Sequence, residues 1–168
     1  MKIEIDQSGK IEKTEKDTIL AFATNNKRTK ITGSIKISAR TKRRLQESFR
    51  QIGEPRKFVV NLFSCAVFLL VKNRLKNVSE INIDTEYPGK GKSIKETLAK
   101  MFFEANIEMP PIRFVLIGKK SFAHEVALRT YHKLLKADQF LDYEILKKNI
   151  FKTKNGCSTL KYQVSDKR

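Results

Sequence analysis

Two aspartates, Asp6 and Asp84, each end a stretch of sequence that predicts a β-strand. Acidic residues are scarce in this chain, which has 18 Asp and Glu against 35 Lys and Arg. If the two strands are parallel neighbours in one sheet, both carboxylates lie at the same edge of that sheet. Clustered carboxylates suit Mg²⁺ or Mn²⁺, and such ions activate water for phosphodiester hydrolysis. The pair therefore predicts a metal site if the carboxylates lie within roughly 8 Å, because the metal–oxygen bonds measure about 2 Å.

Each of these acidic residues also has a purely structural interpretation. Asp6 is followed three residues later by Gly9, and this spacing is typical of a type I turn. Asp84 could be a solvated charge at a strand end, and we expect Glu86 to be exposed. The sequence leaves the metal site and the structural interpretation open for both aspartates.

The segment 81–93 (INIDTEYPGKGKS) suggests a different chemistry. An apolar strand, a glycine-rich turn and Gly91-Lys92-Ser93 follow the order of a P-loop. A P-loop needs a glycine where this chain has Glu86, and a carboxylate there would repel the phosphate. A plain turn between a strand and a helix also fits. The start of the helix could still bind one phosphate of a nucleic-acid backbone.

The strongly basic composition points to a polyanionic partner. The net charge is +17 and the isoelectric point is about 10.0. Between residues 27 and 57 the chain has eleven Lys and Arg but only two Glu. Such a cluster predicts contact with a nucleic-acid backbone, although a solvated basic surface is the alternative. The predicted phosphate contacts are Arg40, Lys42, Arg43, Arg44, Lys90, Lys92, Lys119 and Lys120.

The elements that must position these residues form a mixed α/β pattern. Alternating or apolar runs predict strands, and amphipathic or apolar runs of greater length predict helices. The predicted strands cover 2–6, 18–24, 30–37, 79–86 and 112–117, and the predicted helices cover 38–51, 56–72, 93–105 and 121–137. Two more strands, 143–152 and 158–164, are predicted to form a hairpin around Asn155-Gly156.

This order of elements, with one aspartate on the first strand and one on the fourth, resembles the ribonuclease H-like superfamily. Its members include ribonuclease H, Holliday-junction resolvases, transposases and exonucleases. The segment Ile5-Asp6-Gln7-Ser8-Gly9 is most similar to an uncharacterised branch whose first strand ends Asp-Glu-Ser-Gly. The resemblance covers residues 1–137, and it implies a ribonuclease H-like β-β-β-α-β-α-β-α core.

The resemblance also implies roles for individual residues. Asp6 would be the first metal ligand and Asp84 the second, and the third would be His124 or Glu125, near the start of the last helix. The family's fourth carboxylate is absent from the helix before the fourth strand, where Glu47 or Glu54 is a nearby substitute. Gln7 replaces the glutamate of the similar branch, which is a further departure.

Three functions follow, in decreasing order of support. The first is an Mg- or Mn-dependent nuclease that acts on DNA or RNA, with catalytic residues Asp6, Asp84, His124 and Glu125 and metal ligands Asp6, Asp84 and Glu125. The second is a non-catalytic nucleic-acid-binding protein with the same fold, and the third is an NTP-binding protein that uses Gly91-Lys92-Ser93. We expect a cytoplasmic protein without membrane association, since the start of the chain has no signal-peptide pattern. The residues 138–168 would form a basic hairpin appendage packed on the 1–137 core.

Overall fold

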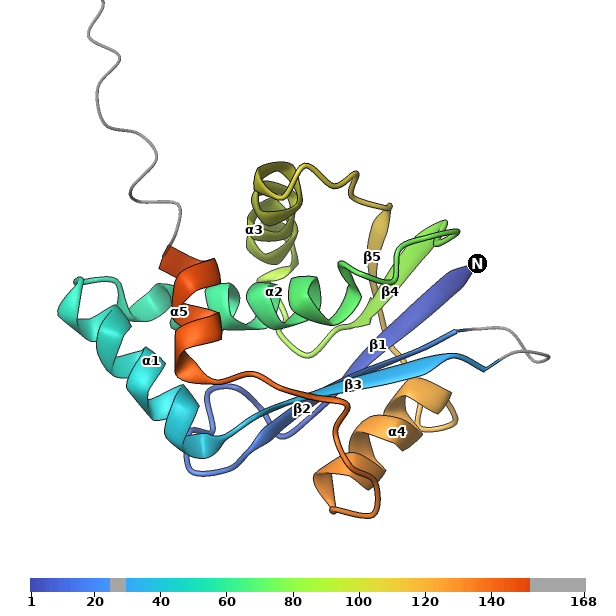
Figure 1. Ribbon diagram of the computed structural model, residues 1–168, viewed down its shortest axis with the longest axis horizontal. Coiled ribbons are helices and arrows are strands. Elements are labelled where there is room, and N and C mark those ends of the chain that lie inside the picture. The colour runs from blue at the N-terminus through green and yellow to red at the C-terminus, as the bar shows by residue number, and fades with distance from the viewer. Residues whose placement is uncertain (25–29, 152–168) are drawn as a thin grey trace, which may run out of the picture.

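The computed structural model describes residues 1–24 and 30–151, and they fold into a mixed α/β structure (Figure 1). Within these residues there are six strands, five α-helices and one short 3₁₀ helix. The strands are β1 (Lys2–Ser8), β2 (Thr18–Thr24), β3 (Thr32–Ile37), β4 (Glu80–Asp84), β5 (Ile112–Val115) and β6 (Gln139–Phe140). The helices are α1 (Ala39–Gln51), η1 (Pro55–Lys57), α2 (Phe58–Val71), α3 (Gly91–Glu104), α4 (Phe122–Tyr131) and α5 (Tyr143–Phe151). The expected α/β class is therefore confirmed.

The six strands form one mixed sheet in the order β5-β4-β1-β2-β3-β6. The first three strands make an antiparallel meander, while β4 pairs with β1 in parallel and β5 pairs with β4 in parallel. In the β1–β4 register, Ile5 lies beside Ile83. The strands that carry Asp6 and Asp84 are therefore parallel neighbours in one sheet, which is the arrangement that the predicted metal site requires.

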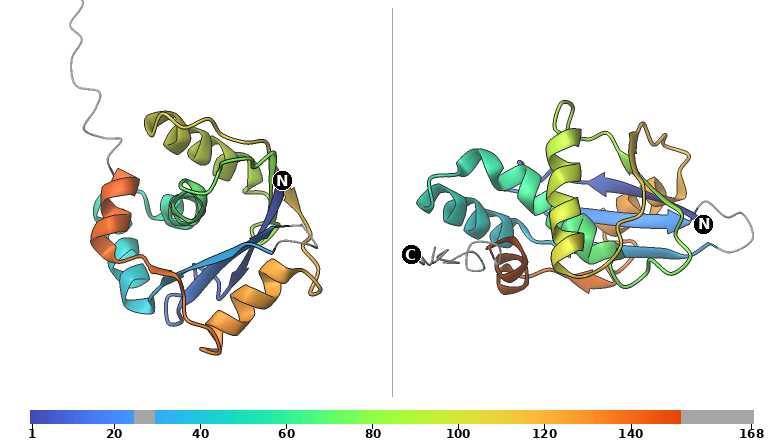
Figure 2. Two further views of the ribbon diagram at one scale, coloured as in Figure 1. Left: turned by 45° about the vertical axis from the view of Figure 1, so that its right-hand side comes forward. Right: turned by 90° about the horizontal axis from the view of Figure 1, so that it is seen from above.

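Helices cover both faces of the sheet, but the two faces differ in chemistry. Helices α1, α2, α3 and α5 gather on one side and α4 lies alone on the other (Figure 2). Because side chains alternate along a strand, β1 directs Ile3 and Ile5 to the core. It directs Glu4 and Asp6 to the opposite face, where both bond to residues of the α4 segment. The two-residue period of β1 therefore separates a hydrophobic face from an acidic one.

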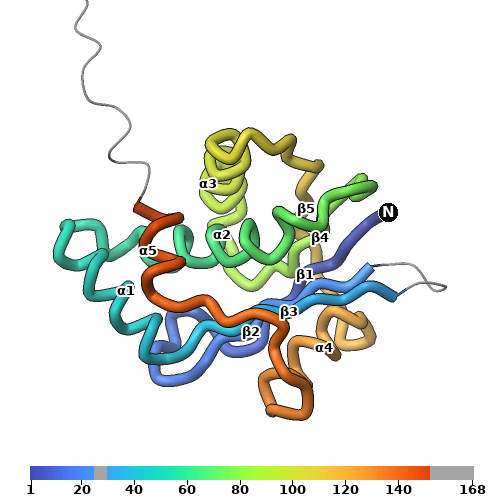
Figure 3. The backbone as a smooth tube through the Cα atoms, viewed as in Figure 1, coloured from blue at the N-terminus to red at the C-terminus, as the bar shows by residue number. Residues whose placement is uncertain are grey.

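The hydrophobic core is centred on α2, which lies above the meander in Figure 3 and contacts β2, β3, α3 and α5. Every side chain from Leu62 to Val71 is buried, so this part of the helix has no exposed polar face. Cys65 is among these buried side chains, as its apolar neighbours predict. No helix in the described part of the chain is both long enough and apolar enough to cross a membrane.

The predicted hairpin at the C-terminal end is wrong in its first half. Tyr143–Phe151 is helix α5, which begins where the Asp142 carboxylate accepts a hydrogen bond from the Ile145 N–H. Leu146 and Ile150, four residues apart, share one helix face and are buried against α1 and α2. The predicted strand 158–164 and the turn at Asn155-Gly156 lie outside the described residues.

The boundary expected at residue 137 also changes. The short strand β6 pairs with β3, so the chain after residue 137 extends the main sheet rather than forming a separate hairpin. Helix α4 ends at Tyr131, six residues before the predicted end at 137. Lys133, just beyond it, has a positive φ of 61°, a left-handed conformation that interrupts an α-helix. The chain then turns back toward β6.

Candidate metal centre

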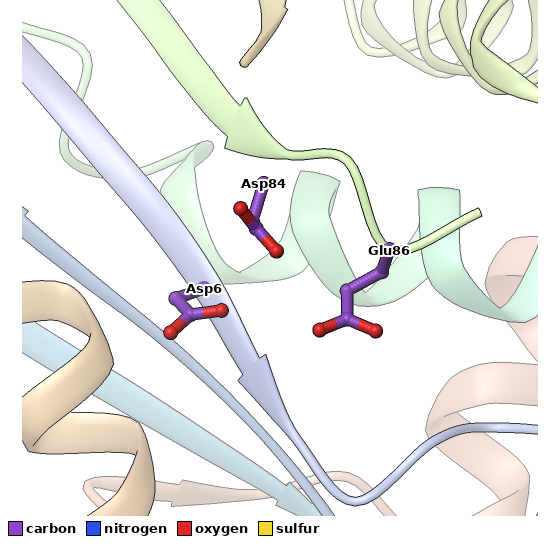
Figure 4. A group of neighbouring side chains, drawn as sticks. All are labelled: Asp6, Asp84 and Glu86. Carbon is purple, nitrogen blue, oxygen red and sulfur yellow. The ribbon is translucent and has the colours of Figure 1, made fainter. Parts of the chain in front are cut away.

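Asp6, Asp84 and Glu86 form a compact cluster, here called the acidic triad (Figure 4). Each contributes a carboxylate oxygen, and these oxygens all lie within 4.8 Å of one another. The parallel register places Asp84 next to Asp6, because Ile83 is paired with Ile5 one residue earlier. The separation is well inside the limit of roughly 8 Å for sharing one ion. The sequence-based pairing of the two aspartates is therefore what the fold produces.

Asp6 is held inside the sheet and does not form a turn. Strand β1 continues to Ser8, and Asp6 is 4% exposed. One carboxylate oxygen, Oδ1, accepts a hydrogen bond from the Gln7 N–H at 2.7 Å, while Oδ2 lies 2.6 Å from His124 Nδ1. Burial raises the pKa of Asp6, and the hydrogen bonds from Gln7 and His124 only partly offset this effect. The turn interpretation of Asp6 is thus wrong.

Asp84 ends β4 and is tied to the segment that follows β5. Its Oδ1 accepts a hydrogen bond from the Ile117 N–H at 2.6 Å. The other carboxylate oxygen of Asp84, Oδ2, could still bind a cation. This bond fixes the carboxylate and also joins the triad to the loop that leads into α4.

Glu86 is the member of the triad that the sequence placed in solvent. It lies two residues beyond β4 and is half-buried beside Asp84. Burial, followed by the negative charge of Asp84, raises the pKa of Glu86, which Lys10 partly lowers. The expectation of simple exposure is therefore wrong.

Tyr87 explains how the loop brings Glu86 inward. Its ring is buried against Phe63, and its hydroxyl oxygen accepts hydrogen bonds from Gln7 Nε2 (3.0 Å) and from the Ile11 N–H (3.1 Å). Gln7, noted above as a departure from the similar branch, is thus one of the anchors of the loop that carries Glu86. No local pattern in the sequence indicates this fold-back, because the hydrogen-bond partners of Tyr87 lie more than 70 residues earlier in the chain.

His124 lies beside the triad because α4 begins directly over β1. Ser121 caps α4 by accepting from the Ala123 N–H, and its hydroxyl donates to Glu4 Oε2 at 2.7 Å. The His124 side chain is 28% exposed and reaches Asp6 through Nδ1. It is therefore a hydrogen-bonded, partly buried histidine adjacent to the carboxylates.

Glu125, the alternative third ligand, lies elsewhere. Its side chain is 50% exposed and pairs with Arg129, one turn along α4, at 3.4 Å. The two weak substitutes for a fourth carboxylate also have other partners, since Glu47 pairs with Arg50 and Glu54 with Lys57. The third carboxylate that accompanies Asp6 and Asp84 is Glu86.

The donor set fits a hard divalent cation. All three triad members are carboxylates, which are the ligands of Mg²⁺ and Mn²⁺ rather than of soft metals. Burial and mutual repulsion hold the pKa values of Asp6 and Glu86 above their usual range. A bound cation would favour the charged form of each group and remove the repulsion between them. Asp6, Asp84 and Glu86 are accordingly the residues that could hold such an ion.

Most of the predicted phosphate contacts are exposed, but Lys42 is not. Its side chain is fully buried, and Nζ donates to the carbonyl oxygens of Lys10 and Lys13 and to Thr18 Oγ1 at 2.8–3.0 Å. The prediction that Lys42 contacts nucleic acid is therefore wrong. The exposed members of the set are Arg40, Arg43, Arg44, Lys90, Lys92, Lys119 and Lys120.

These exposed cations lie on segments that follow the triad strands. Arg43 in α1 donates to the carbonyl of Thr14 in the loop after β1, so α1 lies at the same end of β1 as Asp6. Lys90 and Lys92 begin α3, shortly after Glu86, and Lys119 and Lys120 precede α4. The exposed positive charges thus lie on α1, at the start of α3 and just before α4, in segments that follow the strands of the triad.

Comparison with known proteins gave no matching family model, no matching curated protein and no matching solved structure.

Proposed function

We propose that this protein is a metal-dependent nuclease that hydrolyses phosphodiester bonds with Mg²⁺ or Mn²⁺ held by Asp6, Asp84 and Glu86. The observation that carries the proposal is the convergence of these three carboxylates within 4.8 Å in a chain with a net charge of +17. Leaving three carboxylates together is costly unless a cation compensates them. The high net positive charge of the chain suits a polyanionic substrate.

The order of elements supports a ribonuclease H-like core. Up to α4 the order is three strands, two helices, a strand, a helix, a strand and a helix, so two helices occupy the place of one between β3 and β4. Asp6 and Asp84 occupy the strand positions that the resemblance implies. The departures are Glu86, which comes from a loop, and His124, which bonds to Asp6.

We assign His124 the role of proton carrier in the proposed reaction. When Asp6 is ionised it can only accept, so Nδ1 of His124 carries the hydrogen of their 2.6 Å bond. The neutral ring then keeps Nε2 as an acceptor. In the proposed reaction Nε2 takes a proton from the water as the water oxygen attacks phosphorus. The bond between phosphorus and the leaving oxygen then breaks, and His124 gives the proton to that oxygen, while Asp6 fixes the ring orientation. A bound ion would polarise the phosphate and stabilise the leaving oxygen.

The lysines and arginines would seat the nucleic-acid backbone without reading its sequence. Contacts between these side chains and phosphates fix the position of the strand but carry no sequence information. Lys90 and Lys92 follow Glu86 at the start of α3, and Lys119 and Lys120 follow Ile117, whose backbone N–H bonds to Asp84. We therefore propose that they bind the phosphates that flank the cleaved one.

The test is cleavage of labelled single-stranded and duplex DNA and RNA with Mn²⁺, with Mg²⁺ and in EDTA. We expect metal-dependent cleavage by the wild type and a loss on the order of a thousandfold in Asp84→Asn and in Glu86→Gln. Several kcal/mol of transition-state stabilisation are at stake, and each 1.36 kcal/mol is about tenfold in rate. Glu96→Gln, the same change at an exposed glutamate of α3, is the matched control and should cleave normally. Binding without cleavage under every metal and substrate would instead favour a non-catalytic nucleic-acid-binding protein.

A further inference from the structure

A cavity of about 420 Å³ opens beside the acidic triad, on the face of the sheet that α4 covers. Its wall combines β1, the segment from Val115 to Gly118 and the start of α4. Lys30, Lys120 and Phe122 line it together with Glu4 and Ile117. A cationic cavity with an aromatic ring differs in chemistry from the acidic triad, and nothing in the proposed metal site uses it.

The cavity and the triad share two structural elements. Glu4 lies two residues before Asp6 on the same face of β1, which corresponds to about 7 Å along the strand. Ile117, also in the wall, donates its backbone N–H to Asp84 at 2.6 Å. Glu4 and Ile117 thus connect the wall of the cavity to two of the three triad residues.

Phe122 and the lysines give the cavity the features that bind an unpaired nucleotide. The ammonium group of Lys30 lies 4.0 Å from the centroid of the Phe122 ring. Aromatic side chains combined with cations are what proteins use to hold single strands, because every base can stack on a ring while lysine pairs with the adjoining phosphate. The lysine side chain is long and flexible, so its ammonium can leave the ring for a phosphate when a base takes its place.

The dimensions and setting of the cavity favour one base over a base pair. Its volume is at the small end of the range for pockets that enclose a small ligand. A base that remains paired and stacked in a duplex cannot enter such a cavity, because it would have to leave the stack first. Strand ends, single strands and unpaired positions meet this requirement.

We infer that this cavity binds the base of one unpaired nucleotide next to the phosphate that is cleaved, with Phe122 as the stacking platform and Lys30 and Lys120 on the neighbouring phosphates. The inference rests on the proposed function, and it makes the preferred substrate a strand with an unpaired nucleotide at the triad.

The experiment measures binding of the full-length protein to fluorescently labelled oligonucleotides in EDTA, so that no strand is cut. The wild type should bind a single strand more tightly than a blunt duplex of the same sequence. Phe122→Ala should weaken binding to the single strand by about 5- to 150-fold, because stacking one base on an aromatic side chain is worth about 1–3 kcal/mol. It should leave duplex binding nearly unchanged, and Phe122→Tyr should restore most of the single-strand affinity.

Phe103→Ala provides a matched control, since Phe103 is 85% exposed on α3 and lies outside the cavity. Oligonucleotides that carry 2-aminopurine at one position at a time add a positional readout. One position should differ in fluorescence from its neighbours, and this difference should vanish in Phe122→Ala but persist in Phe103→Ala. Circular dichroism and the melting temperature would show that each variant is folded.

The inference is overturned if folded Phe122→Ala binds single strands as the wild type does, or if fluorescence is equal at all positions. It is also overturned if a free nucleoside monophosphate displaces the oligonucleotide at equal concentration, because the ligand is then a mononucleotide. Cleavage assays separate this inference from the proposed function. A Phe122-dependent base signal without metal-dependent cleavage would preserve the cavity and reject the nuclease. Normal metal-dependent cleavage with no effect of Phe122→Ala on binding would preserve the nuclease and reject the nucleotide-binding cavity.

Discussion

Lys42 in α1 and the acidic triad at the ends of β1 and β4 both place ionisable groups inside the fold, and they differ in how their charge is satisfied. The Lys42 ammonium donates three hydrogen bonds at 2.8–3.0 Å, one to each of three oxygens in the loop and strand that follow β1. Burial lowers the pKa of Lys42 to about 8, so at pH 7 the group is largely protonated and all three donors are present. This is a single charge with a complete set of partners.

The triad instead gathers like charges. Burial raises the pKa values of both Asp6 and Glu86, and Asp84 adds to both shifts through repulsion. Buried polar groups normally have partners, so a cluster that repels itself indicates a function rather than a contribution to stability. Lys42 is thus a buried charge with its partners in the fold, whereas the triad is a cluster of like charges that, in the proposed function, would hold a cation. Variants at the two places should therefore have opposite effects on stability.

The largest expected change in stability is at Lys42. Lys42→Met keeps the unbranched apolar stem but removes three donors, which leaves the carbonyls of Lys10 and Lys13 and the Thr18 hydroxyl without them. The two carbonyls keep the backbone donors Lys13 N–H and Lys16 N–H, so the loss is that of hydrogen bonds from a charged donor. Each such bond contributes about 1.5–3 kcal/mol, partly offset because no charge is buried any longer. We expect the free energy of unfolding to fall by about 2–4 kcal/mol, measured by urea denaturation.

Lys95→Met is the matched control, because Lys95 is exposed on α3 and such surface changes usually stay within about 0.5 kcal/mol. A Lys42→Met protein as stable as the wild type would show that Lys42 is not a structural charge. The interpretation of Lys42 as a phosphate contact would regain support only if nucleic-acid affinity fell while stability did not.

The spacing of apolar residues in the sequence indicates that Lys42 is buried, but the neighbouring basic residues suggested an exposed position. Lys42, Leu45 and Phe49 are spaced i, i+3 and i+7, so they share one face of α1, and all three are buried. Composition assigned Lys42 to the basic surface with Arg43 and Arg44. Position on the helix decides otherwise, since periodicity and not charge determines which side chains face the core.

The candidate site was predictable where it depends on strands and not where it depends on loops. Asp6 and Asp84 could be paired because parallel strands align their ends. Glu86 joins them only because Tyr87 is pulled back onto Gln7 and Ile11, more than 70 residues earlier in the chain. Similarly, α5 was mistaken for a strand because its short apolar spacing is ambiguous until it packs on α1 and α2. Long-range contacts of this kind leave no local pattern.

A smaller effect is expected when Mn²⁺ is added to the folded protein. A ligand that binds only the native state stabilises it by RT ln(1 + [L]/Kd), which is about 1.4 kcal/mol at ten times Kd. The wild type and the control Glu96→Gln should gain this stability together with a higher melting temperature. Glu86→Gln and Asp6→Asn should gain little, because each removes one carboxylate of the triad. If Mn²⁺ stabilised all four proteins equally, the ion would bind elsewhere. The triad would then not be a cation site, and its difference from Lys42 would lose its explanation.

The smallest expected effect is the dependence of stability on pH without metal. Because the pKa of Glu86 is raised from its ordinary value of 4.5, the folded state binds this proton more tightly than the unfolded state does. The contribution of Glu86 to stability is therefore fully present below about pH 4.5 and is lost as the pH rises through the raised pKa.

Glu86→Gln removes this titration, so in EDTA its stability relative to the wild type should increase from pH 4 to pH 7. The gain should be on the order of 1 kcal/mol or less, because the partly solvated position screens the repulsion. Urea denaturation at the two pH values measures it, with Glu96→Gln as the control that should show no such trend. A variant that instead loses stability as the pH rises would mean that Glu86 is stabilised as an anion by the lysines around it. The triad would then resemble Lys42, a charge whose partners are already in the fold.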